Sequence, residues 1–130
     1  LATVIMGRLK NNETYAGNAD TYRTPIYVEH LTEGITELVA NNHPGICHIA
    51  GDDWMNMYQF ACAVAEVFDL DSRLVIPSPA LESASPETGS LGGPEQDVRP
   101  DILGLDCTRT SQRLGLRAFD VVTGLQEMLA

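Results

Sequence analysis

The sequence predicts an α/β chain in which helices are accompanied by a few short strands. Apolar residues recur at helical spacing in five segments, and three short apolar runs have the character of strands. The chain has 130 residues, of which 44% are hydrophobic and 20% charged, a balance typical of one folded domain. Three strands are too few for a doubly wound sheet of the chain's own.

The first part of the chain predicts two helices with extended backbone between them. A helix is expected over residues 1–11, a short strand at 15–16, a polar loop at 18–24 and an extended stretch at 25–28, where Pro25 favours extended backbone. The second helix ends at residues 41–44, and its apolar face holds Leu31, Ile35, Leu38 and Val39. Gly34 costs this helix about 1 kcal/mol relative to alanine, which indicates close packing against a neighbour.

The middle of the chain predicts a strand, a helix and a second strand. Residues 45–50 (GICHIA) form a short apolar run bounded by glycines. Asn56 and Gln59 have the spacing of a capping box, and Met55 with Phe60 can form a hydrophobic staple. The helix that they begin ends near residue 69 and is followed by a brief strand at 74–76, and its apolar face holds Phe60, Val64, Val67 and Phe68.

The last third predicts a long loop and two helices. Residues 77–98 are rich in proline, glycine and serine, which indicates a loop long enough to be functional or disordered. Asp106 or Thr108 caps a short helix that runs to Leu114, with Gly115 just past its end. The final helix is expected over residues 119–129, with Val122, Leu125 and Leu129 facing inward.

The chain is strongly acidic. Eighteen acidic residues face eight basic ones, for a net charge of −10, and Lys10 is the only lysine. This charge repels nucleic acids and anionic membranes, so we expect neither as a partner. An acidic, lysine-poor surface also favours a halophilic source, because molar salt screens the repulsion among carboxylates.

Cysteine and histidine usage indicates no disulfide framework and no metal site. Cys47, Cys62 and Cys107 are an odd number at irregular spacing, so we expect reduced thiols and a cytoplasmic protein. No two histidines have the spacing of metal ligands on one helix. His48 lies in an apolar run and is expected in the core, whereas His30 and His43 are expected at the surface.

Three segments together resemble the extended short-chain dehydrogenase/reductase family, in particular its dTDP-4-dehydrorhamnose reductase branch. The first is residues 23–31 (RTPIYVEHL), and the second is residues 45–51 (GICHIAG) followed by 58–61 (YQFA). The third joins Arg99-Pro100, residues 105–109 (LDCTR), Leu114-Gly115 and Gly124-Leu125. They cover nearly the whole chain in the family's order. The third segment departs from the pattern at Arg109, where a lysine is usual.

The resemblance implies that residues 1–130 are one C-terminal, substrate-binding domain of an extended Rossmann-type reductase, separated from its cofactor-binding half. The family's glycine motif and its catalytic tyrosine-x-x-x-lysine pair are absent, and Gly89, Gly92 and Gly93 follow no strand. We therefore expect no catalytic, cofactor-binding or metal-binding residue here, and an inactive chain when it is alone. The intact protein is expected to use NADPH or NADH.

The same resemblance implies which residues bind a nucleotide sugar. Arg23 and Arg99 stand where the family grips the diphosphate, and arginine binds phosphates through a fixed, permanently charged fork. Tyr27 is expected to line the sugar or base pocket. The residues alone leave other roles open: each arginine could pair with a carboxylate or cap a helix, and Tyr27 could be a half-buried tyrosine of a strand.

The expected function is thus nucleotide-sugar binding for an NAD(P)H-dependent reductase that acts on a 4-keto sugar. Three alternatives remain. One is another nucleotide-sugar epimerase or dehydratase, and the second is a regulatory subunit resembling the methionine adenosyltransferase β subunit. The third is a free-standing interaction domain, because the first helix (LATVIMGRL) presents apolar surface that would bind the missing Rossmann half or a second copy.

Overall fold

A computed structural model confirms the α/β class and describes residues 1–42, 44–79 and 102–129. The described part holds five α-helices and four short strands. The helices are α1 (Ala2–Lys10), α2 (Val28–Ala40), α3 (Met57–Val67), α4 (Thr108–Leu114) and α5 (Val121–Glu127). The strands are β1 (Tyr15–Asn18), β2 (Tyr22–Arg23), β3 (Met55–Asn56) and β4 (Val75–Ser78), and a 3-10 turn at Ser72–Leu74 precedes β4.

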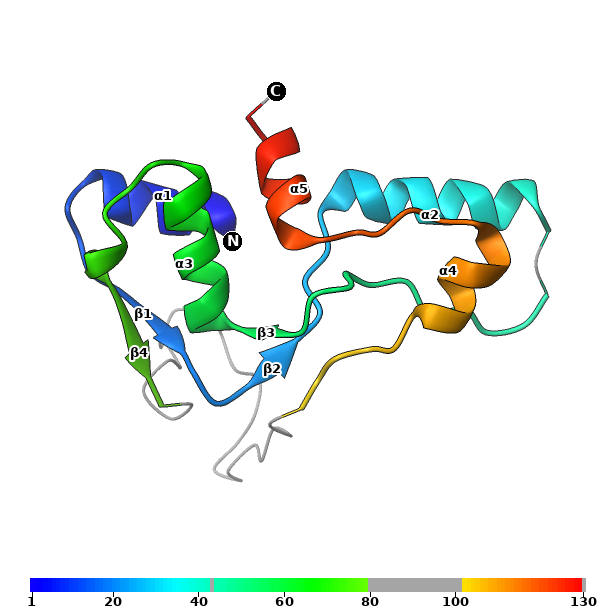
Figure 1. Cartoon of the computed structure of the whole chain (residues 1–130), viewed down its shortest axis with the longest axis horizontal. Coiled ribbons are helices and arrows are strands. Elements are labelled where there is room, and N and C mark those ends of the chain that lie inside the picture. Colours follow the sequence, from blue (N-terminus) through cyan, green and yellow to red (C-terminus); the bar gives the residue numbers. More distant parts are fainter. Residues whose placement is uncertain (43, 80–101, 130) are drawn as a thin grey trace, which may run out of the picture.

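Within the described residues, the strands form two small ladders and no continuous sheet. β1 pairs with β4 in parallel, and β2 pairs with β3 in antiparallel fashion with Arg23 opposite Met55. Figure 1 shows β1 and β4 beside α1 and α3 on one side of the molecule, with α2 and α4 on the other side and α5 between them. The described strands pair only in twos, so they make no doubly wound sheet among themselves.

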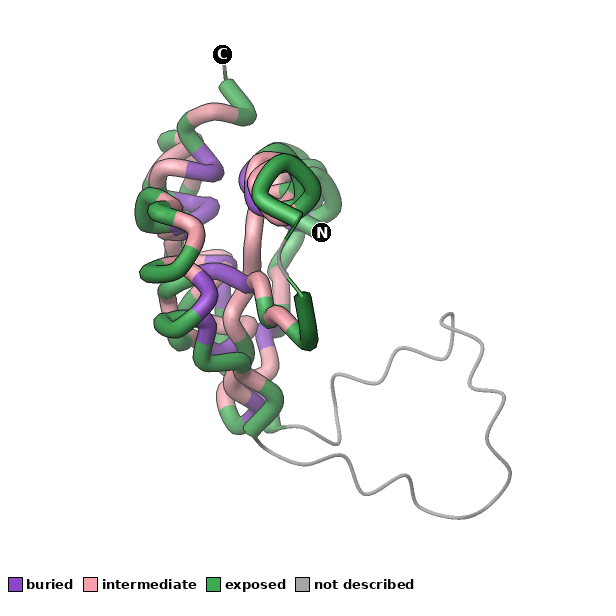
Figure 2. The backbone as a smooth tube through the Cα atoms, turned by 90° about the vertical axis from the view of Figure 1, so that its right-hand side faces the viewer, coloured by how far each residue is buried: buried purple, intermediate pink, exposed green. Residues whose placement is uncertain are grey.

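The core lies where α1, α3, β4 and α5 meet. Its buried members come mostly from α1 and α3, with one residue from β4 and two from α5: Ala2, Ile5, Leu9, Ala61, Val64, Ala65, Val75, Val121 and Leu125. Figure 2 shows the buried residues as short stretches of backbone that lie among half-buried and exposed ones. The predicted capping box is confirmed, because Gln59 N donates to Asn56 Oδ1 at 2.8 Å and Asn56 N donates to Gln59 Oε1 at 3.0 Å.

The helix α2 buries a different face from the one that its periodicity predicts. Ile35 and Val39 are exposed, and the buried residues are His30 and Gly34. The predicted close packing at Gly34 is confirmed, since a Cβ there would lie 3.1 Å from the side chain of Ile49. The helix begins at Val28, so the extended stretch predicted for 25–28 ends one residue early.

The strand predicted at residues 45–50 is wrong, because this segment is irregular and joins no ladder. The amide of His48 donates to the Thr110 hydroxyl at 3.2 Å instead of to a neighbouring strand, and Ile46 is 91% exposed. Ile49 packs against α2 at Gly34, whereas Ile46 is exposed, so this apolar run does not form a pleated surface.

The last two helices differ from their predictions in the N-cap of α4 and in the length and buried face of α5. The helix α4 ends at Leu114 with Gly115 in the left-handed region (φ 64°), as predicted, while Cys107 occupies the N-cap position. Asp106 still accepts from Thr108 N at 2.9 Å, and this contact with Thr108 lowers the pKa of Asp106. In α5 Leu125 is buried as predicted, but Val122 and Leu129 are exposed and Val121 faces the core instead. The loop predicted at 77–98 lies mostly outside the described residues.

Candidate functional site

A hollow of about 420 Å³ lies between β2, the start of α3 and two irregular segments. A volume of this size suits a small organic ligand. Its walls are mostly apolar, and its described lining is Leu1, Arg23, Thr24, Pro25, Ile26, Ile49, Ala50, Met55, Asn56, Met57, Phe60, Leu103 and Leu105.

Backbone pairing holds these walls together. The β2–β3 ladder places Arg23 opposite Met55, directly before the capped N-terminus of α3. The Asn56 side chain also donates to the carbonyl of Ala19 at 2.8 Å, which ties the start of α3 to the turn before β2. On the other side Leu103 N donates to the carbonyl of Tyr22 at 2.9 Å, so residues 102–105 run beside β2.

Arg23 is the one charged side chain among the described lining residues of this hollow. It is exposed and makes no hydrogen bond or ion pair with the residues that the structure describes. Arg117, in contrast, contacts both Glu33 and Glu127. An unpaired guanidinium beside an apolar wall can bind a phosphate at one end of a ligand whose other end is apolar.

Tyr27 does not join Arg23 in the lining of this hollow. Its ring meets the His30 ring edge to face with centroids 5.4 Å apart, and its Cβ lies where a side chain at Gly124 would be. Burial raises the pKa of Tyr27, and the neighbouring Glu29 raises it further. The structure thus sets Tyr27 against α5. The other predicted ligand, Arg99, lies outside the described residues.

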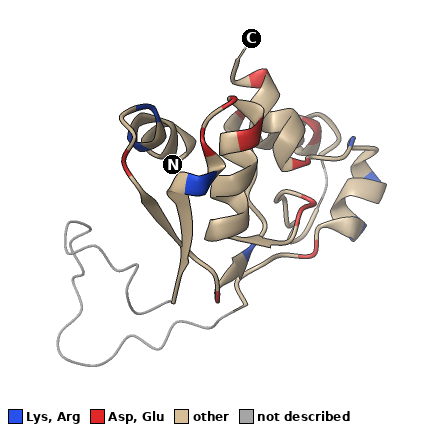
Figure 3. Cartoon of the chain, turned by 60° about the vertical axis from the view of Figure 1, so that its left-hand side comes forward, with Lys and Arg blue, Asp and Glu red and all other residues tan. Residues whose placement is uncertain are grey.

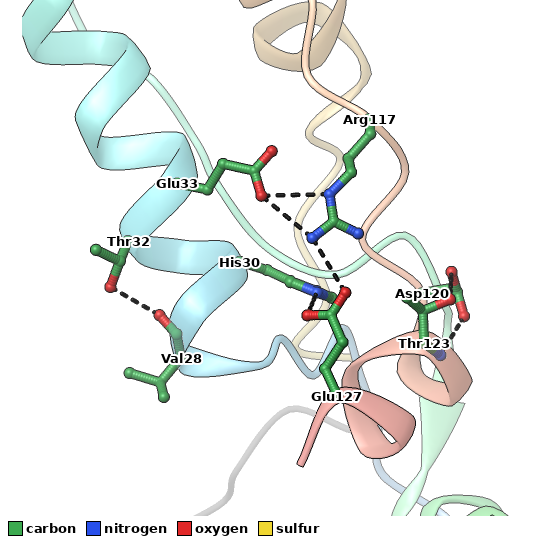
Figure 4. Close-up of polar contacts among 8 residues, drawn as sticks. All are labelled: Val28, His30, Thr32, Glu33, Arg117, Asp120, Thr123 and Glu127. Carbon is green, nitrogen blue, oxygen red and sulfur yellow. Dashed lines mark hydrogen bonds and ion pairs between the residues drawn. The ribbon is translucent and has the colours of Figure 1, made fainter. Parts of the chain in front are cut away.

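His30 is buried, which corrects the prediction that it lies at the surface. Its side chain is 1% exposed, and its ring stacks on Phe119 with centroids 5.1 Å apart. Figure 4 shows its Nε2 directed at Glu127, to which it donates at 2.8 Å, while Arg117 joins the same carboxylate. His48, predicted for the core, is exposed because its segment forms no strand. His43 lies outside the described residues.

Two acidic residues that follow Gly51 hold α5 in place. Asp52 accepts from the amide of Phe119 and Asp53 from the amide of Val121, at the start of α5. Neither residue lines the hollow. Both acids accept from amides at the start of α5, a helix that is far from them along the chain.

Sequence reasoning missed most of the apolar lining. The sequence predicts a strand that contains Ile49 and a helix whose apolar face contains Phe60. It predicts no role for the side chains of Leu103 and Leu105. The available signal is the group of apolar residues Ile102, Leu103 and Leu105, which follows Arg99-Pro100 in a segment without helical periodicity. Such a pattern indicates side chains that face a local surface and not a continuous core.

The three cysteines are free thiols, as predicted. Burial raises the pKa of the Cys107 thiol. No helix in the described part is long and apolar enough to cross a membrane.

Three solved structures with the same fold are dTDP-4-dehydrorhamnose reductases. That of Bacillus anthracis, in complex with NADP, has a TM-score of 0.75 and 18% identity, and covers 98% of this chain and 41% of its own. That of Clostridium acetobutylicum has a TM-score of 0.79 and 16% identity, and covers 99% of this chain and 42% of its own. That of Yersinia enterocolitica has a TM-score of 0.73 and 16% identity, and covers 95% of this chain and 40% of its own.

This chain therefore spans well under half the length of those structures. A search of curated protein sequences finds no match. A model of the family described as RmlD substrate binding domain matches residues 1–130. The resemblance drawn from three short segments is confirmed by this match, and the chain belongs to the RmlD substrate binding domain family.

Proposed function

We propose that this chain supplies the nucleotide-sugar-binding part of an NAD(P)H-dependent dTDP-4-dehydrorhamnose reductase. The observation that carries the proposal is the family match over residues 1–130. The hollow beside β2 supports it, because it combines an apolar wall with one arginine that pairs with no residue the structure describes. A nucleotide sugar presents the matching chemistry: a diphosphate between a base and a sugar.

In this proposal Arg23 binds the diphosphate. Its guanidinium donates two parallel N–H bonds to phosphate oxygens and stays charged at every physiological pH. The apolar residues around it, among them Ile26, Met57 and Phe60, cover the less polar part of the ligand and exclude water. Arg99 and Tyr27 remain proposed substrate contacts of the intact protein.

The reduction itself requires a nicotinamide cofactor, which supplies a hydride to the 4-keto carbon. The described junctions between strands and helices do not fit a dinucleotide, because β3 runs into α3 at Asn56–Met57 without a glycine. The route from β2 to α2 through residues 24–27 also lacks a glycine. Cofactor binding therefore belongs, in our proposal, to a Rossmann half outside this chain.

We further propose that α1 contacts that half. Leu1, the N-cap of α1, is 64% exposed and Val4 within the helix is 58% exposed, while Ile5 and Leu9 face the core. Large apolar side chains gathered on one helix are characteristic of an interface. The cytoplasm is the proposed compartment, which agrees with the three free thiols.

The test is binding of dTDP-rhamnose to the intact protein, with any sequence that accompanies this chain, by isothermal titration calorimetry. Arg23→Gln is expected to weaken binding at least about tenfold, because a charge-assisted contact to phosphate is lost. Arg73→Gln is the matched control, since Arg73 is exposed and pairs only with Asp71 in the described part. Equal affinities in both variants would contradict the role of Arg23, and no binding in the wild type would contradict the function.

A further inference from the structure

A second hollow, of about 280 Å³, lies between α4 and the turn that follows α2. It shares no lining residue with the hollow beside β2. The turn forms one wall and α4 forms the other. The lining residues are Pro44, Gly45, Ile46, Cys47, Arg109, Thr110 and Arg113. No acidic residue is among them.

Two arginines face this hollow from one side of α4. Arg109 and Arg113 are four residues apart, so their side chains leave the helix on the same face. Both are exposed, and neither makes an ion pair or hydrogen bond with the described residues, although the chain carries eighteen acidic groups. Figure 3 shows basic positions on α4, while acidic positions are spread over many other segments. Two like charges four residues apart destabilise a helix slightly, so an anion bound between them would reduce their repulsion.

The facing turn adds further donors. Gly45 has φ 97°, a left-handed conformation that glycine adopts without strain and that turns the chain toward α4. The amides of Ile46 and Cys47 donate to no acceptor among the described residues. The Thr110 hydroxyl accepts from His48 N, so its own hydrogen remains available to donate. Amides that converge on one point in a turn form anion-binding concavities.

We infer that this hollow binds a dianionic oxyanion, namely the phosphoryl group of a small phosphorylated molecule. Two guanidinium forks and the amides of the turn supply donors from opposite sides, and a phosphoryl group offers enough acceptor oxygens for both. A volume of about 280 Å³ fits a small molecule and not a polymer. The net charge of −10 opposes an extended polyanion or an anionic membrane, which would bring many charges close to the acidic surface.

The site is independent of the proposed nucleotide-sugar pocket. We expect Arg23→Gln to leave anion binding at α4 unchanged, and Arg109→Gln to leave dTDP-rhamnose binding unchanged. The experiments can therefore contradict phosphate binding at α4 without contradicting nucleotide-sugar binding at Arg23, and the reverse.

The test is a titration of the intact, ¹⁵N-labelled protein with inorganic phosphate, followed by NMR and matched in ionic strength with sodium chloride. We expect saturable shifts of the amides of Ile46 and Cys47 and of the Nε–H groups of Arg109 and Arg113. Arg109→Gln and Arg113→Gln are each expected to weaken phosphate binding at least about tenfold. Arg73→Gln is the control for the loss of one positive charge.

Each other outcome decides against the site. Shifts spread equally over Arg8, Arg23 and Arg73, or an unchanged affinity in both α4 variants, would overturn it. A second arm uses vesicles that contain phosphatidic acid. Binding to the vesicles without saturable shifts by inorganic phosphate would assign the arginines to a lipid surface and overturn a small-molecule ligand.

Discussion

At the scale of single residues, the buried side chain of His30 connects α2 to α5. His30 lies near the start of α2, and its ring is held between Tyr27 and Phe119. A carboxylate can only accept, so the His30 Nε2 that contacts Glu127 must carry the hydrogen. The same carboxylate accepts from Arg117, which also contacts Glu33 of α2. This group of contacts fixes α5 against α2.

His30→Ala is expected to lower the free energy of unfolding by about 2–4 kcal/mol, because it leaves a cavity beside Phe119 and removes a hydrogen bond to a charged group. Urea denaturation followed by circular dichroism measures this change. His48→Ala is the matched control: His48 is exposed, and we expect less than about 0.5 kcal/mol. Similar losses in both variants would contradict the assignment of His30 as the buried histidine.

At the scale of single elements, α5 depends on its first residues. Asp120 is its N-cap, and its carboxylate accepts from Thr123 N at 2.8 Å and from the Thr123 hydroxyl at 2.7 Å. The backbone hydrogen bond from Thr123 is the main cause that lowers the pKa of Asp120. Asp52 and Asp53 hold the amides of the preceding turn and of Val121. A seven-residue helix thus receives much of its stability from side chains outside it.

Asp120→Ala is expected to cost about 1 kcal/mol at neutral pH through the loss of the cap. The pKa of Asp120 is lower in the folded state, so its contribution is complete above the unfolded value of about 3.9 and is lost as the pH falls through the folded value. The difference between wild type and Asp120→Ala should therefore shrink below about pH 4, as measured by urea denaturation across pH.

Asp120→Asn is the control for charge, because asparagine is also a good N-cap but does not titrate. We expect its stability relative to Asp120→Ala to be independent of pH. A pH dependence that is the same in the asparagine variant would show that another group is responsible.

Local signals in the sequence predicted the elements whose ends are set by neighbouring residues. Asn56 with Gln59 and Gly115 after Leu114 placed the start of α3 and the end of α4 correctly, because caps act over three or four residues. Contacts between distant segments were not predictable in this way. The face of α2 depends on Phe119, Glu127 and Ile49, which no periodicity within α2 reveals.

Only one residue of the hollow beside β2 is expected from the sequence as a ligand contact. The resemblance of residues 23–31 to the reductase family implies that Arg23 binds the diphosphate, and Arg23 lines this hollow. Tyr27 follows it by four residues but belongs to the contacts of α5, since the backbone turns into α2 directly after it. The apolar walls come from three segments that are distant in sequence, so only the fold brings them together.

At the scale of the whole molecule, the charge predicts how stability depends on salt. Eighteen acidic and eight basic residues leave a net charge of −10, and repulsion among exposed carboxylates opposes the folded state. The screening length falls from about 30 Å at 0.01 M salt to about 3 Å at 1 M. We expect the melting temperature to be higher in molar KCl than at low salt. Equal or greater stability at low salt would contradict a halophilic adaptation.

The exposed apolar side chains of α1 predict how the 130 residues behave without a partner. We expect this chain alone to self-associate at concentrations at which Val4→Gln does not, because Val4 is 58% exposed on a helix whose other side is in the core. Light scattering measures the mass of each. A clean monomer of the unmodified chain would contradict an interface at α1.

The central claim, that this chain is the substrate-binding part of a reductase, is tested most directly by loss of NADPH absorbance in the presence of dTDP-4-dehydrorhamnose. The intact protein is expected to consume NADPH, and the chain of 130 residues alone is expected to consume none. An intact protein that binds dTDP-rhamnose but never consumes NADPH or NADH would contradict the claim and favour a regulatory subunit. Turnover by the 130 residues alone would contradict the division of roles between this chain and a Rossmann half.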